Sequence, residues 1–125
     1  MSEGNRVRSF RELLVWQKGI ELTKEVCSLT HHFPAEEKFG LVSQLRRAAV
    51  SVPSNVAEGQ ARRSSAEFSQ FLSVSLGSLA ELETQLIIAS ELGITSGTEI
   101  DPLLSRIHEL QKMLHSLRSK LATTH

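Results

Sequence analysis

The chain has 125 residues, a length typical of one compact domain, and its 14 basic residues balance its 14 acidic residues. This neutral charge excludes the markedly basic composition that is typical of nonspecific nucleic-acid binding. Cys27 is the one cysteine, so an internal disulfide or a cysteine-based zinc site cannot form. A chain without disulfides is typical of a reducing compartment.

The first eight residues are polar and show no hydrophobic periodicity, which predicts a flexible N-terminal tail over 1–8. No apolar signal-peptide segment follows the charged N-terminus, and no stretch of about 18 apolar residues occurs. We therefore expect a cytoplasmic protein with no membrane partner. Periodic patterns predict one helical domain over 9–121, followed by a C-terminal tail over 122–125.

The first predicted helix opens at Ser9, a residue type that caps helices, with an acidic residue three positions later as in a capping box. Its apolar residues recur every three or four positions along more than one stripe. The helix is expected to end near His32, because Pro34 disfavours helical geometry at the residue before it.

The second predicted helix begins at Pro34 and reaches Gly59. Its apolar stripe consists of Leu41, Leu45, Ala48, Val52 and Val56. The stripe continues through Pro53, which removes one backbone hydrogen bond and obstructs the carbonyl of Ala49. We expect a helix kinked at Pro53, with a break at that residue as the alternative.

The third predicted helix is capped by Ser64 and Glu67 and stops at Gly93. Its middle is rich in small residues, which let another helix approach closely. The fourth begins near Thr98 or Asp101, and its apolar stripe is regular: Leu103, Ile107, Leu110, Leu114, Leu117 and Leu121. Because the connections are short and no strand pattern occurs, we predict an all-α fold, an antiparallel up-down-up-down four-helix bundle.

Charge differs between the second and third predicted helices. The third helix has glutamates but no lysine or arginine, whereas arginines dominate 41–63. If the second helix continues through Gly59, five polar residues share one of its faces: Arg47, Ser51, Asn55, Glu58 and Arg62. With Arg46 and Arg63, these residues are the candidate contact set for another subunit, a partner or RNA.

The candidate contact set has two interpretations. In the favoured one, Glu58 pairs with Arg62, and the other arginines are solvated or contact another helix or subunit. In the other, the arginines contact RNA phosphates, which would position a nucleic acid without reading its sequence. Neutral overall charge and the lack of interleaved aromatic residues count against RNA.

Patterns for catalysis and metal binding fail on spacing. A di-metal bundle site needs Glu-x-x-His repeats, but Ser105 stands three residues before His108, and Lys112 stands three before His115. A metal shared between subunits by the two histidines is a minor alternative. Neither Cys27 nor any serine has an activating motif beside it. We expect a non-enzymatic protein with no cofactor, no metal and no small-molecule substrate.

A family resemblance rests on three segments, FRELLVWQKGIEL, FPAEEKFGLVSQLRRAAVSVPSNVAEG and SSAEFSQFLSVSLGSLAELETQL. From Phe10 to about Leu121 the chain resembles the bacterial four helix bundle protein family, also named for proteins encoded in intervening sequences of 23S ribosomal RNA. The resemblance implies a left-handed antiparallel bundle assembled into a homo-oligomeric ring, expected to be a pentamer. A related branch, the accessory proteins of diversity-generating retroelements, engages nucleic acid and a reverse transcriptase. The family has no established enzymatic activity.

The leading functional hypothesis is an oligomeric adaptor or accessory protein whose second helix offers a surface to structured RNA or to a nucleoprotein partner. The alternative is a purely structural or protein-binding homo-oligomer with no nucleic-acid role. Within a ring, the basic second helix of one subunit is expected to face the acidic third helix of the next.

Overall fold

The structure is a computed structural model that describes residues 9–122, and within that range it contains helices and no strand. Four long helices dominate it: α1 (Leu14–Thr30), α2 (Ser43–Gln60), α3 (Ser65–Glu91) and α4 (Gly97–Ala122). The predicted all-α class with four helices is confirmed. The predicted N-terminal tail, 1–8, lies outside the described residues. Of the predicted C-terminal tail, Ala122 ends α4 and residues 123–125 lie outside them.

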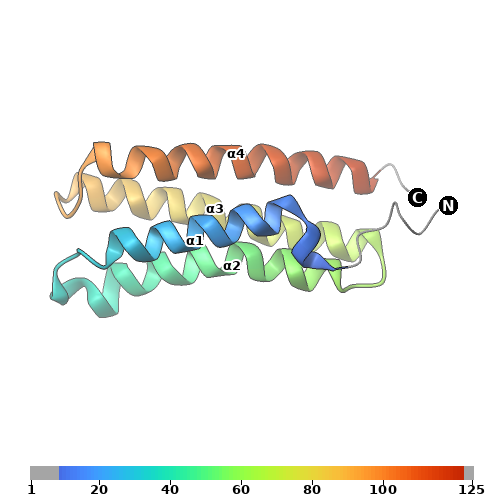
Figure 1. Ribbon diagram of the computed structural model, residues 1–125, viewed down its shortest axis with the longest axis horizontal. Helices are drawn as coiled ribbons and strands as arrows, with labels where there is room; N and C mark the ends of the chain where they lie inside the picture. The colour runs from blue at the N-terminus through green and yellow to red at the C-terminus, as the bar shows by residue number, and fades with distance from the viewer. Residues whose placement is uncertain (1–8, 123–125) are drawn as a thin grey trace.

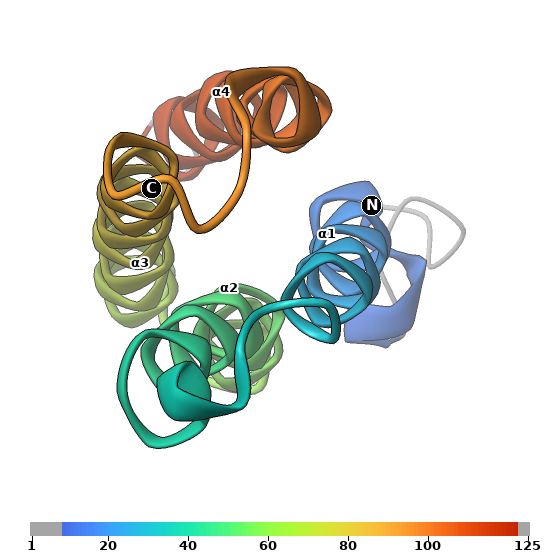
Figure 2. The ribbon, with the colours of Figure 1, turned by 90° about the vertical axis from the view of Figure 1, so that its left-hand side faces the viewer.

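The four helices lie along the long axis of the molecule, and successive connections alternate between its two ends (Figure 1). Seen along that axis, each helix occupies one corner (Figure 2). α1 contacts α2 and α4, and α3 contacts the same two helices. The arginine-rich α2 and the acidic α3 are therefore neighbours within one chain and share one side of the molecule.

The core between the helices is aliphatic. All four helices contribute fully buried large side chains: Leu22, Leu45, Leu72, Leu79, Leu82, Leu86, Ile107, Leu110 and Leu114. Burying one such side chain contributes about 1.5–3 kcal/mol relative to leaving it in water. This burial holds the helices together more than the individual polar contacts between them.

The start of α1 differs from the prediction. Phe10–Glu12 form a short 3₁₀ turn, and Ser9 Oγ accepts a hydrogen bond from the backbone N–H of Arg11 at 3.1 Å. The next residue is extended, and α1 begins at Leu14, later than predicted. The side-chain amide of Gln17 donates to the carbonyl of Arg11 at 2.9 Å. Ser9 therefore caps the 3₁₀ turn that comes before α1, and not α1 itself, because the N–H that it accepts from belongs to Arg11 in that turn.

The chain between α1 and α2 is helical but irregular. After Pro34 it forms a 3₁₀ turn, Ala35–Glu37, and then a π-helical turn, Lys38–Val42, before α2 begins at Ser43. The regular second helix was predicted to start at Pro34, but it starts later, at Ser43. Turns of the π type are often found at functional sites. This one leaves the side chain of Phe39 89% exposed.

Pro53 lies inside α2, which continues through it. Proline has no N–H to bond the carbonyl of Ala49 one turn earlier. The hydroxyl of Thr23 in α1 lies 3.2 Å from that carbonyl oxygen and 2.8 Å from the Gly19 carbonyl oxygen, so the two acceptors share its one hydrogen. Gly19 in α1 makes room for the proline ring, since a Cβ added there would lie 3.2 Å from Pro53 Cβ. The kink predicted at Pro53 stays a prediction.

The predicted ends of α3 are confirmed. Ser64 Oγ accepts from the backbone N–H of Glu67 at 3.1 Å, which makes Ser64 the N-cap as predicted, and the Ser64 hydroxyl donates to the Glu67 carboxylate. Gly93 follows the helix with a φ of 75°, a left-handed conformation that favours glycine. By length and composition α3 could also cross a membrane, but a helix packed within a core passes the same test.

The start of α4 at Gly97 is held by a capping box. The Glu99 carboxylate accepts from the Thr95 hydroxyl at 2.9 Å and from the Ser96 backbone N–H at 3.1 Å, and Ser96 Oγ accepts from the Glu99 N–H. These hydrogen bonds, that from Thr95 foremost, lower the pKa of Glu99 below its ordinary value. The later of the two predicted starts, Asp101, is therefore wrong.

Candidate subunit and partner interface

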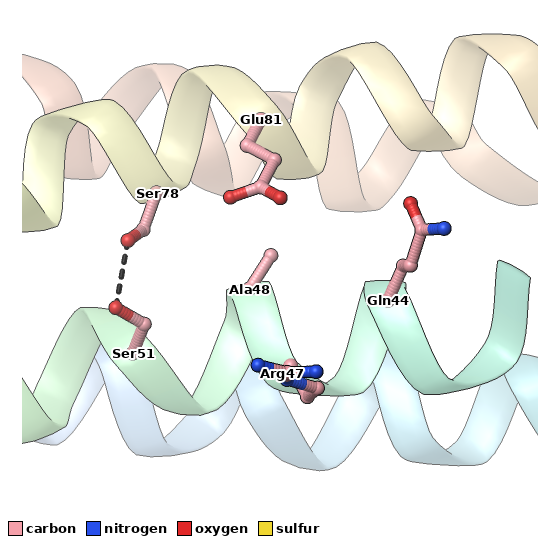
Figure 3. A pocket seen from close by; sticks show the side chains of 6 residues that line it. All are labelled: Gln44, Arg47, Ala48, Ser51, Ser78 and Glu81. Atoms are coloured by element: carbon pink, nitrogen blue, oxygen red, sulfur yellow. Dashed lines mark hydrogen bonds between the residues drawn. The ribbon is translucent and has the colours of Figure 1, made fainter. Parts of the chain in front are cut away.

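An open groove of about 490 Å³ lies between α2 and α3 (Figure 3). We call it the α2–α3 groove, and it is lined by Gln44, Arg47, Ala48, Ser51, Ser78 and Glu81. In Figure 3 the Glu81 side chain extends from α3 toward α2, and Gln44 extends from α2 toward α3. The groove exists because the α2 side carries a short alanine where a larger side chain would fill the space.

One end of the α2–α3 groove is closed by hydroxyl groups. Ser51 Oγ and Ser78 Oγ lie 2.7 Å apart, the contact drawn as a dashed line in Figure 3. The side-chain amide of Asn55 donates to Ser51 Oγ at 3.0 Å and to the Ser51 carbonyl at 2.8 Å. Ser51 and Asn55, both predicted as contact residues, thus take part in joining α2 to α3.

The other end of the groove is organised by Gln85 of α3, which the sequence did not single out. Its amide donates to Gln44 Oε1 at 3.3 Å and to Glu81 Oε2 at 3.2 Å. Gln85 is only 6% exposed, and its Oε1 has no hydrogen-bond partner among the described residues. The signal available in the sequence was a glutamine directly before the buried Leu86. This amide orients the Glu81 carboxylate into the groove.

Arg47 and Glu81 place opposite charges on the two sides of the groove. Both residues are exposed, and no ion pair joins them within the described part of the chain. The basic and acidic surfaces that the sequence assigned to separate helices therefore lie side by side on one face. Each charge is available to a partner.

Exposed apolar side chains lie beside these charges. On α3, Val74 is 50% exposed and Ile88 is also exposed. Both share the side of the helix that carries Glu81, since they lie seven residues before and after it. Gly77 lies on the same side, and no atom is within 4 Å of the place where its Cβ would stand. We call the groove together with Val74, Gly77 and Ile88 the α2–α3 face.

Arg46 belongs to a different part of the surface. Its Nε donates to Thr30 Oγ1 at 2.9 Å, and its Nη2 donates to the Cys27 carbonyl at 3.4 Å. The last carbonyls of a helix lack partners within the helix, and cationic side chains stabilise them. The Cys27 carbonyl already accepts from the His31 backbone N–H at 3.1 Å, so Arg46 adds a second hydrogen bond there and places its charge at the C-terminus of α1. The sequence did not predict this cap, because Arg46 and the end of α1 come together only in the folded chain.

The remaining predicted residues lie at the far end of α2. Glu58 Oε2 is 3.9 Å from Arg62 Nη2, so the predicted pair is present, although such an exposed pair contributes only about 0–1 kcal/mol. The Arg62 guanidinium also lies 4.7 Å from the centre of the Phe71 ring. Arg63 is exposed in the connection to α3. The shared face predicted to reach Arg62 on the helix ends with α2 at Gln60.

Within residues 9–122, no group of three or more histidine, cysteine, aspartate or glutamate side chains could hold a metal ion. His108 Nε2 instead lies 3.0 Å from Glu83 Oε2, which joins α4 to α3. A groove between the same helices brings His108 and His115 together beside Lys112. A metal shared between subunits by these two histidines stays the minor alternative that it was in the sequence.

Comparison with known proteins identifies relatives of the chain. The family model described as 23S rRNA-intervening sequence protein matches residues 11–116. The crystal structure of a protein with unknown function from the S23 ribosomal protein family of Bacteroides thetaiotaomicron is similar, with a TM-score of 0.78 and 23% sequence identity. That match covers 84% of this chain and 98% of the other, and it shows a shared fold. No curated protein matches the chain.

Proposed function

The chain belongs to the 23S rRNA-intervening sequence protein family, and we propose that it is a non-enzymatic, cytoplasmic adaptor that works as a homo-oligomer. The proposed subunit is a left-handed antiparallel four-helix bundle, and the proposed assembly is a pentameric ring. The family is of unknown function and is not a known enzyme family. The observation that carries the proposal is the α2–α3 face, which combines an open groove, opposite charges and exposed apolar side chains.

The apolar part of the α2–α3 face supports a subunit contact. Val74 and Ile88 are exposed on a helix that carries no lysine or arginine, and Val50 is exposed beside Arg47 on α2. Clustered apolar side chains at a surface commonly mark an interaction site. Gly77 adds room for a neighbouring helix, although a glycine in a helix costs about 1 kcal/mol relative to alanine.

The charges of the face support a specific arrangement of subunits. Contacts around a ring are heterologous, so two different patches meet at every interface. If the α2 side of one subunit meets the α3 side of the next, Arg47 pairs with the neighbour's Glu81. Gln85 holds that carboxylate in place before the neighbour arrives. The pair then selects the register of the contact, which is the usual contribution of charge at an interface.

Arg47→Glu is expected to break the oligomer into smaller species, because Glu81 of the neighbour would face a like charge. The predicted weakening of each contact is about tenfold or more. Light scattering coupled to size-exclusion chromatography measures the mass. Lys24→Glu is the matched control, since it makes the same charge change on exposed α1 surface outside the groove and should leave the mass unchanged.

A charge swap sharpens this test. The double variant Arg47→Glu with Glu81→Arg restores opposite charges across the proposed interface and should recover the original mass. An Arg47→Glu protein that keeps its oligomeric mass would rule out the contact. A dissociated protein that the swap fails to restore would show that Arg47 acts through another residue.

RNA binding by the arginines of α2 and of the connection that follows it is the second candidate, favoured by the exposure of Arg47 and Arg63. It is the weaker one, because Arg46 caps α1, Arg62 pairs with Glu58, and Glu81 would repel a phosphate in the groove. Binding to a structured RNA across a salt series tests it, since affinity that depends on phosphates falls steeply with salt. If no binding is measured at low salt, the purely protein-binding homo-oligomer stands.

A further inference from the structure

A second pocket, of about 300 Å³, lies at the end of the molecule where α1 connects to α2. Three nitrogen-bearing side chains line it, those of His31, Lys38 and Arg46, and no lining residue is acidic. Phe33, which is 9% exposed, forms part of its apolar wall. We call this the end pocket, and its chemistry is that of an anion site.

The strongest cation of the end pocket is held in place before any ligand binds. Thr30 and the Cys27 carbonyl accept hydrogen bonds from the Arg46 guanidinium, which is partly buried. These contacts use one N–H of Nε and one of Nη2, and a guanidinium has five N–H donors. The remaining N–H donors lie in the same rigid plane. A phosphate can therefore form charge-assisted hydrogen bonds with them at little further cost in side-chain entropy.

The aromatic ring of Phe39 does not line the end pocket, but it follows the lining residue Lys38, whose ammonium group lies over one face of the ring. The π-helical turn exposes 89% of Phe39, and Nζ of the pocket residue Lys38 lies 5.6 Å from the centre of the ring. Leaving so large an apolar side chain in water is unfavourable unless a partner covers it. An aromatic surface next to a cationic groove is how proteins bind single-stranded nucleic acid, with the base stacked and the phosphate paired.

Acidic residues are close in sequence but do not enter the pocket. Glu36 and Glu37 belong to the 3₁₀ turn that precedes Lys38, and neither is among the lining residues. Their carboxylates reduce the long-range attraction for an anion, so affinity must come from direct contacts within the pocket. Such a site suits one phosphate group better than a long phosphate backbone.

We propose that the end pocket binds one nucleotide, with its phosphate against Lys38, Arg46 and His31 and its base stacked on Phe39. The same chemistry describes a free mononucleotide and the 5′-phosphorylated end of a single-stranded RNA. The site is separate from the α2–α3 face and does not depend on the proposed oligomer.

Calorimetric titration with adenosine monophosphate, adenosine and inorganic phosphate tests the proposal. Adenosine monophosphate should bind more tightly than either fragment, because it alone uses both the pocket and the ring. Phe39→Ala should weaken its binding at least about fivefold and leave inorganic phosphate unaffected. Lys38→Ala should weaken both the nucleotide and inorganic phosphate. Both side chains are exposed, so these variants should fold, unlike a variant of the capping Arg46.

Lys24→Ala is the control, since it removes an exposed cation of α1 that lies outside the end pocket and should change none of these affinities. Titration with oligoadenylate, with and without a 5′ phosphate, distinguishes a free mononucleotide from an RNA end as the ligand. A site for an RNA end should bind the 5′-phosphorylated strand more tightly than adenosine monophosphate, whereas a mononucleotide site should not. Equal affinities for adenosine monophosphate and inorganic phosphate, or unchanged binding in both variants, would overturn the proposal. Arg47→Glu should bind the nucleotide normally, which keeps this result independent of the oligomer test.

Discussion

Replacement of Gly59 by alanine is expected to destabilise the fold by about 1–3 kcal/mol, although alanine is the better helix former. A Cβ at this position would lie 2.7 Å from Phe71 Cβ and 2.9 Å from Phe68 Cδ1. The Phe68 ring can turn aside, but a Cβ moves only with its backbone. The substitution therefore pushes α2 and α3 apart near their connection, where glycine allows their closest approach.

Urea denaturation followed by circular dichroism measures this loss as a lower free energy of unfolding. The matched control is Gly97→Ala, because no atom lies within 4 Å of the added methyl group at that position. The control should stay within about 0.5 kcal/mol of the parent protein. A Gly59→Ala protein as stable as the control would contradict the close contact between α2 and α3.

Thr23→Val is expected to destabilise the protein by about 1–3 kcal/mol, the cost of leaving a buried acceptor without its partner. Valine keeps the shape of threonine but removes the hydroxyl that lies 3.2 Å from the Ala49 carbonyl. Pro53 cannot donate to this carbonyl. Because Ala49 is fully buried, water does not easily replace the hydroxyl.

A double-mutant cycle with Pro53→Ala isolates this contact. Alanine at position 53 has an N–H that can bond the Ala49 carbonyl, so Thr23→Val should cost less in that background. The expected coupling is about 0.5–3 kcal/mol in the free energy of unfolding. Equal costs in the two backgrounds would show that Thr23 stabilises α1 itself, through its 2.8 Å bond to the Gly19 carbonyl, and does not compensate for the proline.

The two glycines show how unequal the sequence signals were. Gly93 follows a long apolar stripe, so its role as a helix stop was predictable from its neighbours. Gly59 looked like a similar stop, but its Cα faces two phenylalanines of the next helix. Nothing within a few residues of Gly59 indicates that contact. A local pattern reports the backbone conformation of a segment and not the distance to another element.

The candidate site divides in the same way. The sequence predicted Arg47 as a contact residue and Glu58 with Arg62 as a pair, because helix spacing alone brings such residues to one side. It did not predict that Arg46 caps α1, nor that Gln85 holds Glu81 beside Arg47. Those contacts join residues of different helices, so they depend on which helices are neighbours and in which register.

The π-helical turn at Lys38–Val42 was also beyond prediction. Its residues continue the apolar stripe of the second helix, so their spacing indicated a regular α-helix from Pro34. In this turn Phe39 lies at the surface, and Lys38 is one of the residues that line the end pocket together with Arg46. Packing of Phe33 and Val42 into the core accompanies this irregular turn.

The sequence by itself determined the all-α class, the four helices and the Ser64 cap of α3, because each follows from residues within one or two turns. The cap formed by Ser96 and Glu99 before α4 was not predicted. Only the tertiary structure decided what Gly59, Thr23 and Arg46 contact. Helix formation is governed by local hydrogen bonds and apolar periodicity, whereas the groove and the end pocket arise where separate helices meet. Which side chains fill the space between two helices, and in which register, depends on how both helices pack against each other. The sequence of one helix does not contain that information.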